Sequence, residues 1–248
     1  KKAKNELPNN GAVIKTIVSS NLTDAIAKEY GVKLFSTLTG FKNIAKIIRG
    51  FEQDNSYNCL FSYEESYGCI IGTHARDKDG IVAVMTVCEA AAYYKKQGLT
   101  LWDQMNKIYE KYGYYKEKQM SITLKGSEGA IQIKKMMENM RNNPVKEIAG
   151  LKVVSFGDYE KQEITDVNGN KASTGLPKSN VLYFDLEKNA WVCVRPSGTE
   201  PKIKFYMGVC GNSLDNADKE LEKLEIAIKE MALSLIHISE PTRHLRIS

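Results

Sequence analysis

The sequence predicts a three-layer α/β domain followed by a smaller α+β domain. In the first half, short apolar runs alternate with helical patterns, which is typical of parallel strands covered by helices on both sides. In the second half, several short strand patterns separated by turn signals are followed by one long periodic helix. We place the boundary near Tyr115–Gln119. The predicted division is a linker at 1–10, domains at 11–117 and 118–232, and a tail at 233–248.

Composition and charge limit the classes of function. The chain has 248 residues, of which 42% are hydrophobic and 26% charged, as in ordinary globular proteins. No stretch approaches the roughly 18 apolar residues of a membrane span. The net charge of +5 is too small to indicate nucleic acid by itself. We therefore expect neither a membrane nor a nucleic-acid partner, whereas anionic small molecules are compatible with this charge.

The cysteines indicate a reducing compartment. Their number is odd and none are spaced as CxxC, which favours reduced, buried thiols in a cytoplasmic protein. They are Cys59, Cys69, Cys88, Cys193 and Cys210.

The elements of the first domain follow from local patterns. Apolar runs predict strands at 12–18, 32–35 and 59–62. Helical patterns lie at 22–30, 43–51, 80–94 and 101–113, the first of them ended by Gly31. The loops 37–42 and 63–68 follow two of the strands. Because ligands bind beyond the carboxyl ends of parallel strands, these are candidate binding loops.

The second domain is predicted to consist mainly of short strands. Strands are predicted at 120–124, 152–156, 161–166, 180–185, 190–194 and 202–209. Asn168-Gly169 marks a turn, and the residues around Glu187–Asn189 connect two strands as a hairpin. Helices are predicted at 127–141 and 214–231, the latter with apolar residues three and four apart, which favours packing on the sheet.

The last residues do not share the period of the preceding helix. Residues 233–248 look like the translation of a sequencing adapter and are expected to be a non-native tail. His237 and His244 lie in this segment, so His74 alone remains, and we expect neither a histidine-based metal site nor a Ser-His-Asp triad. The first residue is Lys1 rather than Met, which together with this tail suggests a gene fragment.

The loop Arg195–Pro201 (RPSGTEP) carries the strongest chemical signal. It lies between two predicted strands and is stiffened by two prolines. Gly198 allows a close approach of backbone N–H groups, and Ser197, Thr199 and Arg195 add hydroxyl and guanidinium donors. Donors that converge on one point form a phosphate cradle. An ordinary polar turn is the alternative.

Two acidic segments have weaker signals. Glu64 and Ser66 lie two residues apart at a strand end, and a carboxylate beside a hydroxyl suits the vicinal hydroxyls of a sugar. A charged loop that serves solubility is the alternative. The segment His74–Gly80 contains an Asp-x-Asp-Gly fragment but lacks the later ligands of a calcium loop. Its basic residues would instead face an anion.

Three of these segments resemble one family in order along the chain. Arg195–Pro201 resembles the phosphate-binding loop of the α-D-phosphohexomutases, and Tyr63–Gly68 (YEESYG) is similar to their sugar-recognition loop. Thr37–Lys42 (TLTGFK) resembles the loop that helps to distinguish the two ends of the sugar. The resemblance covers residues 11–232 and implies the third and fourth of four domains, the fourth having a TATA-binding-protein-like shape.

The resemblance also implies roles for individual residues. Those expected to hold the non-reacting phosphate are Arg195, Ser197, Gly198 and Thr199. Those expected at the sugar are Glu64, Ser66, Gly40, Lys42 and Lys78. The family transfers phosphate reversibly between the 1- and 6-positions of a hexose. A phosphoserine donates its phosphoryl group, and a sugar bisphosphate serves as intermediate and activator.

Two loops of the family have no match in this chain. These are the phosphoserine loop and the Asp-x-Asp-x-Asp-Arg loop that binds Mg²⁺, both of which belong to the first two domains. We therefore expect no catalytic residue and no metal ligand here. The implied partners are a phosphosugar and the N-terminal domains of the same protein, and the chain alone is expected to be inactive.

The residues of the sugar-recognition loop bear on which sugar is the substrate. The letters Glu-Glu-Ser-Tyr-Gly are closer to the phosphoglucomutase and phosphopentomutase branches than to the Gly-Glu-Met-Ser-Gly-His form of bacterial phosphomannomutases. Glucose phosphates are favoured, with pentose or mannose phosphates as alternatives. A rival of another class is a non-catalytic phosphate- or RNA-binding module, because Phe205 and Tyr206 follow the basic loop. A steep salt dependence of binding would favour RNA.

Overall fold

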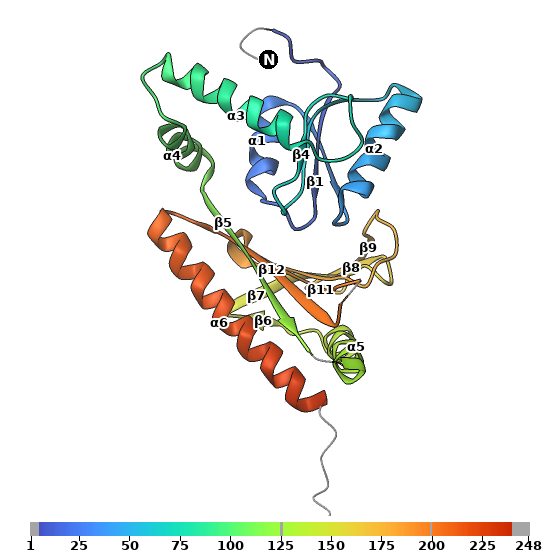
Figure 1. Ribbon diagram of the computed structural model, residues 1–248. Coiled ribbons are helices and arrows are strands. Elements are labelled where there is room, and N and C mark those ends of the chain that lie inside the picture. The colour runs from blue at the N-terminus through green and yellow to red at the C-terminus, as the bar shows by residue number, and fades with distance from the viewer. Residues whose placement is uncertain (1–4, 125, 199, 240–248) are drawn as a thin grey trace, which may run out of the picture. The chain divides into compact units, whose positions relative to one another are not determined.

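The computed structural model describes residues 5–124, 126–198 and 200–239, with side chains described as far as residue 236 (Figure 1). The chain divides into two compact units, Lys1–Tyr115 and Lys116–Ser248. In the described part of the chain, no helix combines the length and the apolar character that a membrane crossing requires. The mixed α/β character predicted for the chain is confirmed.

The first unit is built on a small sheet. Its strands are β1 (Gly11–Thr16), β2 (Lys33–Thr37), β3 (Asn58–Tyr63) and β4 (Cys69–Ile70), in the order β2-β1-β3-β4. β1 is parallel to both β2 and β3, as predicted. β4 runs antiparallel to β3, with Tyr63 opposite Cys69. The sheet is therefore not wholly parallel, because the chain reverses directly after β3 instead of crossing over through a helix.

Four helices belong to this unit: α1 (Leu22–Tyr30), α2 (Phe41–Asp54), α3 (Gly80–Lys95) and α4 (Leu101–Tyr112). Gly31 ends α1 in the left-handed conformation (φ 65°), as the sequence predicts. α2 begins two residues before the predicted helix because Gly40, at φ 101°, turns the chain into it. The core on the α2 side joins the sheet to helix residues such as Ile44 and Ile48.

α3 is apolar along most of its length, but none of its residues is buried. It contacts β4 and α4 and leaves much of its surface open. Cys88 is exposed on it, so the prediction that this thiol is buried is wrong. Of the other four cysteines, Cys193 alone is fully buried.

The second unit is built on a larger, mainly antiparallel sheet. Its order is β5-β12-β11-β10-β7-β8-β9, and β6 (Glu147–Ile148) pairs with β7. The strands on this path are β5 (Tyr114–Thr123), β7 (Leu151–Asp158), β8 (Glu163–Asp166), β9 (Lys171–Ser173), β10 (Leu182–Leu186), β11 (Trp191–Pro196) and β12 (Lys202–Gly211). β5 begins six residues before the predicted strand, so the division between the units falls inside it.

Turns and helices complete the second unit. The short 3-10 helix Glu187–Asn189 joins β10 to β11 as a hairpin. In the turn after β8, the Asp166 carboxylate accepts hydrogen bonds from the backbone of Asn168 and Asn170. α5 (Gly126–Asn142) contacts both α6 (Leu214–Ser239) and β12.

α6 extends past the predicted end at residue 231. The helix continues to Ser239, and Leu235 is 8% exposed. The reason is local, since the first residue that interrupts a helix in this region is Pro241. Residues 240–248 lie outside the described residues, and the origin of the segment 233–248 stays a prediction.

Candidate functional site

The parallel strands of the first unit bring its polar loops to one edge of the sheet. β1, β2 and β3 end at Thr16, Thr37 and Tyr63. Because the three strands are parallel, the loops that follow them start at the same edge. The predicted binding loops 37–42 and 63–68 both begin there.

The loop after β3 is a tight turn. The backbone N–H of Glu64 donates to the carbonyl of Gly68 at 2.8 Å, and Tyr67 adopts a left-handed conformation at φ 62°. A Cβ atom on Gly68 would lie 2.6 Å from Cδ of Lys78 and 2.9 Å from Oε1 of Glu64. Glycine at this position lets the Lys78 side chain approach the turn.

The turn positions a buried carboxylate. Glu64 is 7% exposed, although it lies in a surface loop. Its Oε1 accepts a hydrogen bond from Ser66 Oγ at 2.9 Å and lies 3.4 Å from Lys78 Nζ. The charge of Glu64 raises the pKa of Lys78. The structure thus brings three of the predicted sugar-binding residues together.

The neighbouring carboxylate faces the sheet. Glu65 Oε2 accepts a hydrogen bond from Thr16 Oγ1 at 2.7 Å, and that hydroxyl lies 2.9 Å from Ser19 Oγ. Thr16 and Ser19 are buried at the end of β1. Glu65 therefore fastens the turn to β1, while Glu64 is left to hold Ser66 and Lys78. Sequence reasoning missed this contact, and the two adjacent acidic residues were the only signal for it.

Gly40 and Lys42 lie at the start of α2. The Gly40 carbonyl accepts from the backbone of Asn43 at 2.9 Å, which begins the helix. The predicted loop position of Lys42 is corrected, because this residue is in the first turn of α2 and is exposed. It lines a groove of about 520 Å³ with Lys46, Arg49, Arg76 and other residues of α2 and the segment before α3.

The groove and the Glu64 cluster are linked through Phe41. Lys78 Nζ lies 5.8 Å from the centroid of the Phe41 ring, which is the residue before Lys42. Asp77, the residue before Lys78, lines the groove. Lys78 thus lies beside the first residue of α2.

A buried lysine near this edge was also missed. Lys15 is 3% exposed, and its ammonium donates to Asn21 Oδ1 at 2.9 Å and to the Ser20 carbonyl at 3.1 Å. It also pairs with Asp24 at 2.5 Å. The signal was available, since a lysine inside the apolar run of β1 requires polar partners when it is buried. These contacts fix the loop that leads from β1 to α1.

The loop 197–201 of the second unit is held at both ends by strands. β11 and β12 pair up to Pro196 opposite Ile203. The backbone N–H of Ser197 donates to the Lys202 carbonyl at 2.7 Å, and the Pro201 carbonyl accepts from Leu124 at 2.9 Å. The hairpin therefore presents its loop on a rigid base.

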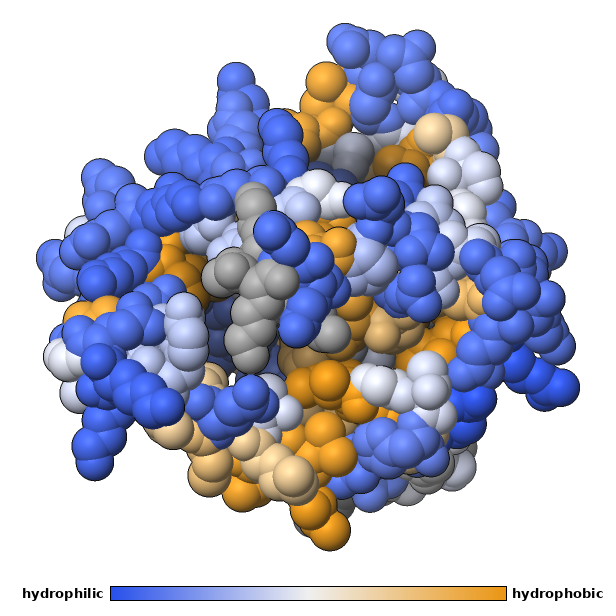
Figure 2. Space-filling model, turned by 90° about the horizontal axis from the view of Figure 1, so that it is seen from above, coloured by the Kyte–Doolittle hydropathy of each residue, from blue (hydrophilic) through white to orange (hydrophobic). Residues whose placement is uncertain are grey.

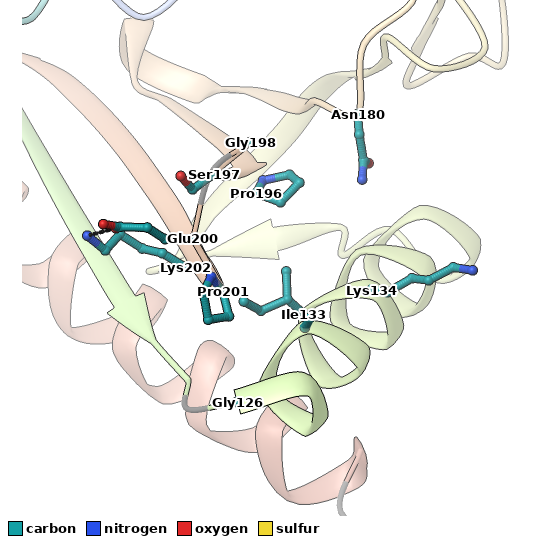
Figure 3. A pocket seen from close by; sticks show the side chains of 11 residues that line it. Gly126, Ile133, Lys134, Asn180, Pro196, Ser197, Gly198, Glu200, Pro201 and Lys202 are labelled. Carbon is teal, nitrogen blue, oxygen red and sulfur yellow. Dashed lines mark ion pairs between the residues drawn. The ribbon is translucent and has the colours of Figure 1, made fainter.

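A cavity of about 520 Å³ lies beside this loop (Figure 3). Its lining includes Ser197, Gly198 and Lys202 from the hairpin. Lys134 of α5 and Asn180 line it too, and sequence reasoning did not select either. Their signal is weak, because an exposed helix lysine and a loop asparagine are common on any surface. The lining therefore combines polar donors with the Glu200 carboxylate, which pairs with Lys202.

Charge inside the loop is partly compensated. Glu200 pairs with Lys202 at 2.7 Å, and the ammonium lowers the pKa of the Glu200 carboxyl (Figure 3). The Glu200 carboxylate is thus neutralised by a residue of its own hairpin.

The structure places the four residues predicted at the phosphate differently with respect to this cavity. Ser197 and Gly198 line the cavity. Arg195, half-buried near the end of β11 opposite Lys204, is not among the described residues that line it. Thr199 lies outside the described residues. A Cβ atom on Gly198 would meet nothing within 4 Å, so the fold itself does not require glycine there.

The segment His74–Asp79, before α3, contributes the residue that caps this helix. Asp79 caps α3 by accepting from the backbone of Ile81 and Val82, and it lies 2.9 Å from His74 Nε2. These contacts lower the pKa of Asp79, the His74 hydrogen bond having the largest effect. In the described part of the chain, no three His, Cys, Asp or Glu residues are grouped to hold a metal ion.

Comparisons with known proteins agree on one family. Residues 1–112 match the model of the phosphoglucomutase/phosphomannomutase α/β/α domain III, and residues 135–223 match that of the C-terminal domain. A phosphoglucomutase of Staphylococcus haemolyticus is 38% identical over 217 residues, covering 87% of this chain and 39% of the relative. A phosphoglucomutase of Staphylococcus aureus is 40% identical over 209 residues, covering 84% of this chain and 37% of the relative.

Solved structures show the same fold. Parafusin, an exocytosis-sensitive phosphoprotein and phosphoglucomutase from Paramecium, superposes in its open form with a TM-score of 0.61 at 19% identity. The match covers 93% of this chain and 39% of that one. The chain therefore spans about two fifths of the length of the relatives that it matches. It belongs to the phosphoglucomutase/phosphomannomutase family, of which it carries domain III and the C-terminal domain.

Proposed function

We propose that this chain is the sugar- and phosphate-binding half of a phosphohexomutase, with glucose 1- and 6-phosphates as the favoured substrates. The observation that carries the proposal is the buried Glu64 carboxylate, held between Ser66 and Lys78 at the carboxyl end of the parallel strands β1, β2 and β3. Residues 11–117 would act as domain III and residues 118–232 as domain IV. The matched relatives are named as phosphoglucomutases, which supports glucose.

The sugar contacts follow from the chemistry of the Glu64 cluster. A carboxylate accepts and a serine hydroxyl both accepts and donates, so the pair fits two adjacent hydroxyls of a sugar. Lys78 adds a positive charge that would attract a phosphosugar. Vicinal hydroxyls can be presented by a hexose in either of two orientations, which a mutase requires. Gly40 and Lys42 would border the same substrate.

The phosphate contacts follow from the hairpin loop. Arg195, Ser197, Gly198 and Thr199 would hold the phosphate that does not react. Charge-assisted hydrogen bonds from a guanidinium are about twice as strong as neutral ones. The open space at Gly198 supports this role, because it leaves the backbone N–H groups accessible to an anion.

The reaction itself would need further groups. The family resemblance implies a phosphoserine that donates its phosphoryl group to the substrate and takes the other one back from the bisphosphate. The described residues do not form a site for the implied Mg²⁺ ion. This chain would therefore bind and orient the phosphosugar, and it would show no turnover of glucose 1-phosphate alone.

Calorimetric titration tests this proposal. Glucose 1-phosphate, glucose 6-phosphate, mannose 1-phosphate and ribose 1-phosphate are titrated separately into the chain. We expect both glucose phosphates to bind more tightly than the other two. Glu64→Gln should weaken the binding of glucose 1-phosphate by about tenfold or more, because a hydrogen bond to a charged group contributes roughly 1.5–3 kcal/mol. Tighter binding of mannose or ribose phosphate would assign the chain to another branch.

A control variant distinguishes the loss of a specific contact at Glu64 from the loss of one negative charge. Glu160→Gln removes a negative charge from an exposed residue of the second unit. It should leave the affinity unchanged, so a similar loss in both variants would mean that the overall charge governs binding. The titration is repeated at higher salt. An affinity that changes little would exclude a nucleic-acid-binding site, for which affinity falls steeply with salt. Failure of a folded chain to bind any of the four sugars would contradict the proposal.

A further inference from the structure

The second unit contains a groove of about 860 Å³ that lies outside the candidate functional site. Its lining comes from the end of α5, the segment that follows this helix, and the strands β6, β7, β8 and β9. It shares no described lining residue with the cavity beside the hairpin loop. Apolar side chains such as Val145, Phe156 and Val167 alternate in it with lysines. A concave surface of this volume and composition is typical of a small-molecule site.

An irregularity in β7 opens the groove to apolar contact. Ser155 of β7 lies opposite Asp185 of β10. The next pair is Val153 opposite Leu186, which leaves Val154 as an extra residue in β7. Such a β-bulge redirects a side chain and is frequent beside binding sites. Val154 lines the groove and is 40% exposed, although it lies within a strand.

Asp158 supplies an unsatisfied acceptor. Its side chain lines the groove and is 5% exposed. Oδ1 accepts hydrogen bonds from Arg141 Nε at 3.1 Å and from the backbone N–H of Glu160 at 3.2 Å. Oδ2 is buried and accepts no hydrogen bond from a described residue. A buried acceptor without a donor is costly, so this oxygen indicates a ligand that donates a hydrogen bond.

The charges around Asp158 favour a neutral donor. Arg141 donates to Asn180 Oδ1 at 2.6 Å and pairs with the exposed Glu160, so its position is fixed. Lys161 Nζ lies 3.4 Å from Oδ2, and 59% of its side chain is exposed, so it can turn into solvent when a ligand enters. Because Arg141 stays paired with Asp158, a hydroxyl group satisfies Oδ2 without burying a second cation.

Lys146 gives the groove an open positive charge. Its carbonyl accepts from the backbone N–H of Val153 at 2.9 Å, which places it beside β7. It is exposed, lines the groove and forms no ion pair with a described residue. Acidic residues of the lining have partners within it: Glu163 pairs with Lys171 at 2.9 Å, and Glu147 lies opposite Lys152. An acidic group on a ligand would therefore be attracted to Lys146.

We propose that this groove binds an elongated phenolic carboxylic acid. The phenolic hydroxyl donates to Oδ2 of Asp158, and the carboxylate faces Lys146. The aromatic body lies against Val154 and Phe156 between them. This site is separate from the phosphosugar site, and it does not depend on the function proposed above.

Two probes that differ in one group test the proposal. They are 4-hydroxycinnamate and cinnamate, titrated separately into this chain, with the dissociation constants measured by ligand-observed NMR. The hydroxylated probe should bind at least about tenfold more tightly, because cinnamate leaves the charged Asp158 oxygen without a donor. Equal affinities would overturn the proposal, and so would the failure of both probes to bind.

Variants locate the bound probe. Val154→Glu places a charge against the aromatic body and should weaken the binding of 4-hydroxycinnamate by at least about tenfold. Lys146→Ala should weaken it by about two- to fivefold, as expected for an exposed ion pair. Lys178→Ala removes an exposed lysine that does not line the groove, and it should leave the affinity unchanged. Urea unfolding checks each variant, and Lys146→Ala decides if Val154→Glu does not fold.

Other apolar surfaces are distinguished in the same titration. Figure 2 shows apolar residues exposed on the face that it presents, and Ile81 of the first unit is 76% accessible. An aromatic probe can adhere to exposed apolar surface of this kind. Affinity that is lost in Ile81→Gln and retained in a folded Val154→Glu variant would place the probe on the first unit and overturn the proposal.

Discussion

The carboxylate of Glu65 accepts a hydrogen bond of 2.7 Å from the hydroxyl of Thr16, across 49 positions of the chain. This contact joins the turn after β3 to the buried end of β1. Glu64 and Ser66, which flank Glu65, are held in place by the same turn. The geometry of the Glu64 cluster therefore depends on a neighbouring residue that contacts β1 and not Ser66 or Lys78.

Thr16→Val should loosen this turn. The substitution keeps the shape of the side chain but removes the hydroxyl that donates to the Glu65 carboxylate. We expect the opening free energy of β1 and β3 amides in native-state hydrogen exchange to fall by about 1–3 kcal/mol. Thr86→Val is the control, because the Thr86 hydroxyl donates to the Val82 carbonyl within its own helix. Equal effects of the two changes would refute the role of the Glu65 contact.

Gly68→Ala tests the close packing beneath the turn. The added methyl group would lie 2.6 Å from Cδ of Lys78 and 2.9 Å from Oε1 of Glu64, so both side chains must shift. Overpacking of this kind costs about 1–3 kcal/mol, measured by urea unfolding, and glucose 1-phosphate should bind more weakly. Gly50→Ala in α2 meets no atom within 4 Å and should stabilise the chain by up to about 1 kcal/mol. A stable Gly68→Ala variant with unchanged affinity would contradict this geometry.

Two aspartates of the second unit should respond to pH in opposite ways. Burial raises the pKa of Asp185, whereas the hydrogen bond from Asn170 lowers that of Asp166. With a raised folded-state pKa, Asp185 ionises first in the unfolded chain, so its contribution to stability is lost as pH rises above about 4. Asp185→Asn should therefore stabilise the chain at pH 7, with a gain that shrinks as pH falls towards 4.

Asp166→Asn should do the reverse. The lowered pKa of Asp166 means that its contribution is present above the unfolded value and is lost as pH falls. This variant should be less stable than the parent at pH 7 and equal to it in strong acid. Urea midpoints across the pH range measure both variants. The same sign of pH dependence in the two would be incompatible with the burial of Asp185.

Local sequence patterns are sufficient to predict the fold at positions where a single residue type determines the backbone conformation. Gly31 ends α1 because only glycine enters the left-handed conformation without strain, and this is visible in the sequence. The parallel order of β1, β2 and β3 follows equally from the alternation of strands and helices. The start of α2 was placed two residues late, because Phe41 and Lys42 were assigned to the loop that Gly40 closes.

Contacts between distant segments could not be predicted in this way. The sequence shows two adjacent glutamates, but it does not show that Glu65 meets Thr16 while Glu64 meets Lys78. The apolar pattern of α3 indicates a helix suited to burial, yet burial depends on what the rest of the protein supplies. The lining of the second-unit cavity by Lys134 likewise depends on how α5 packs near the hairpin.

The most direct test of the account compares Gly198→Ala with the parent chain. Because a methyl group on Gly198 meets no atom of the protein, the variant should unfold at the same urea concentration as the parent. If the loop holds phosphate through its backbone, calorimetry should show both glucose 1-phosphate and glucose 6-phosphate bound at least about tenfold more weakly by the variant. Unchanged affinity for both ligands, in a variant of unchanged stability, would contradict the assignment of this loop to the phosphate.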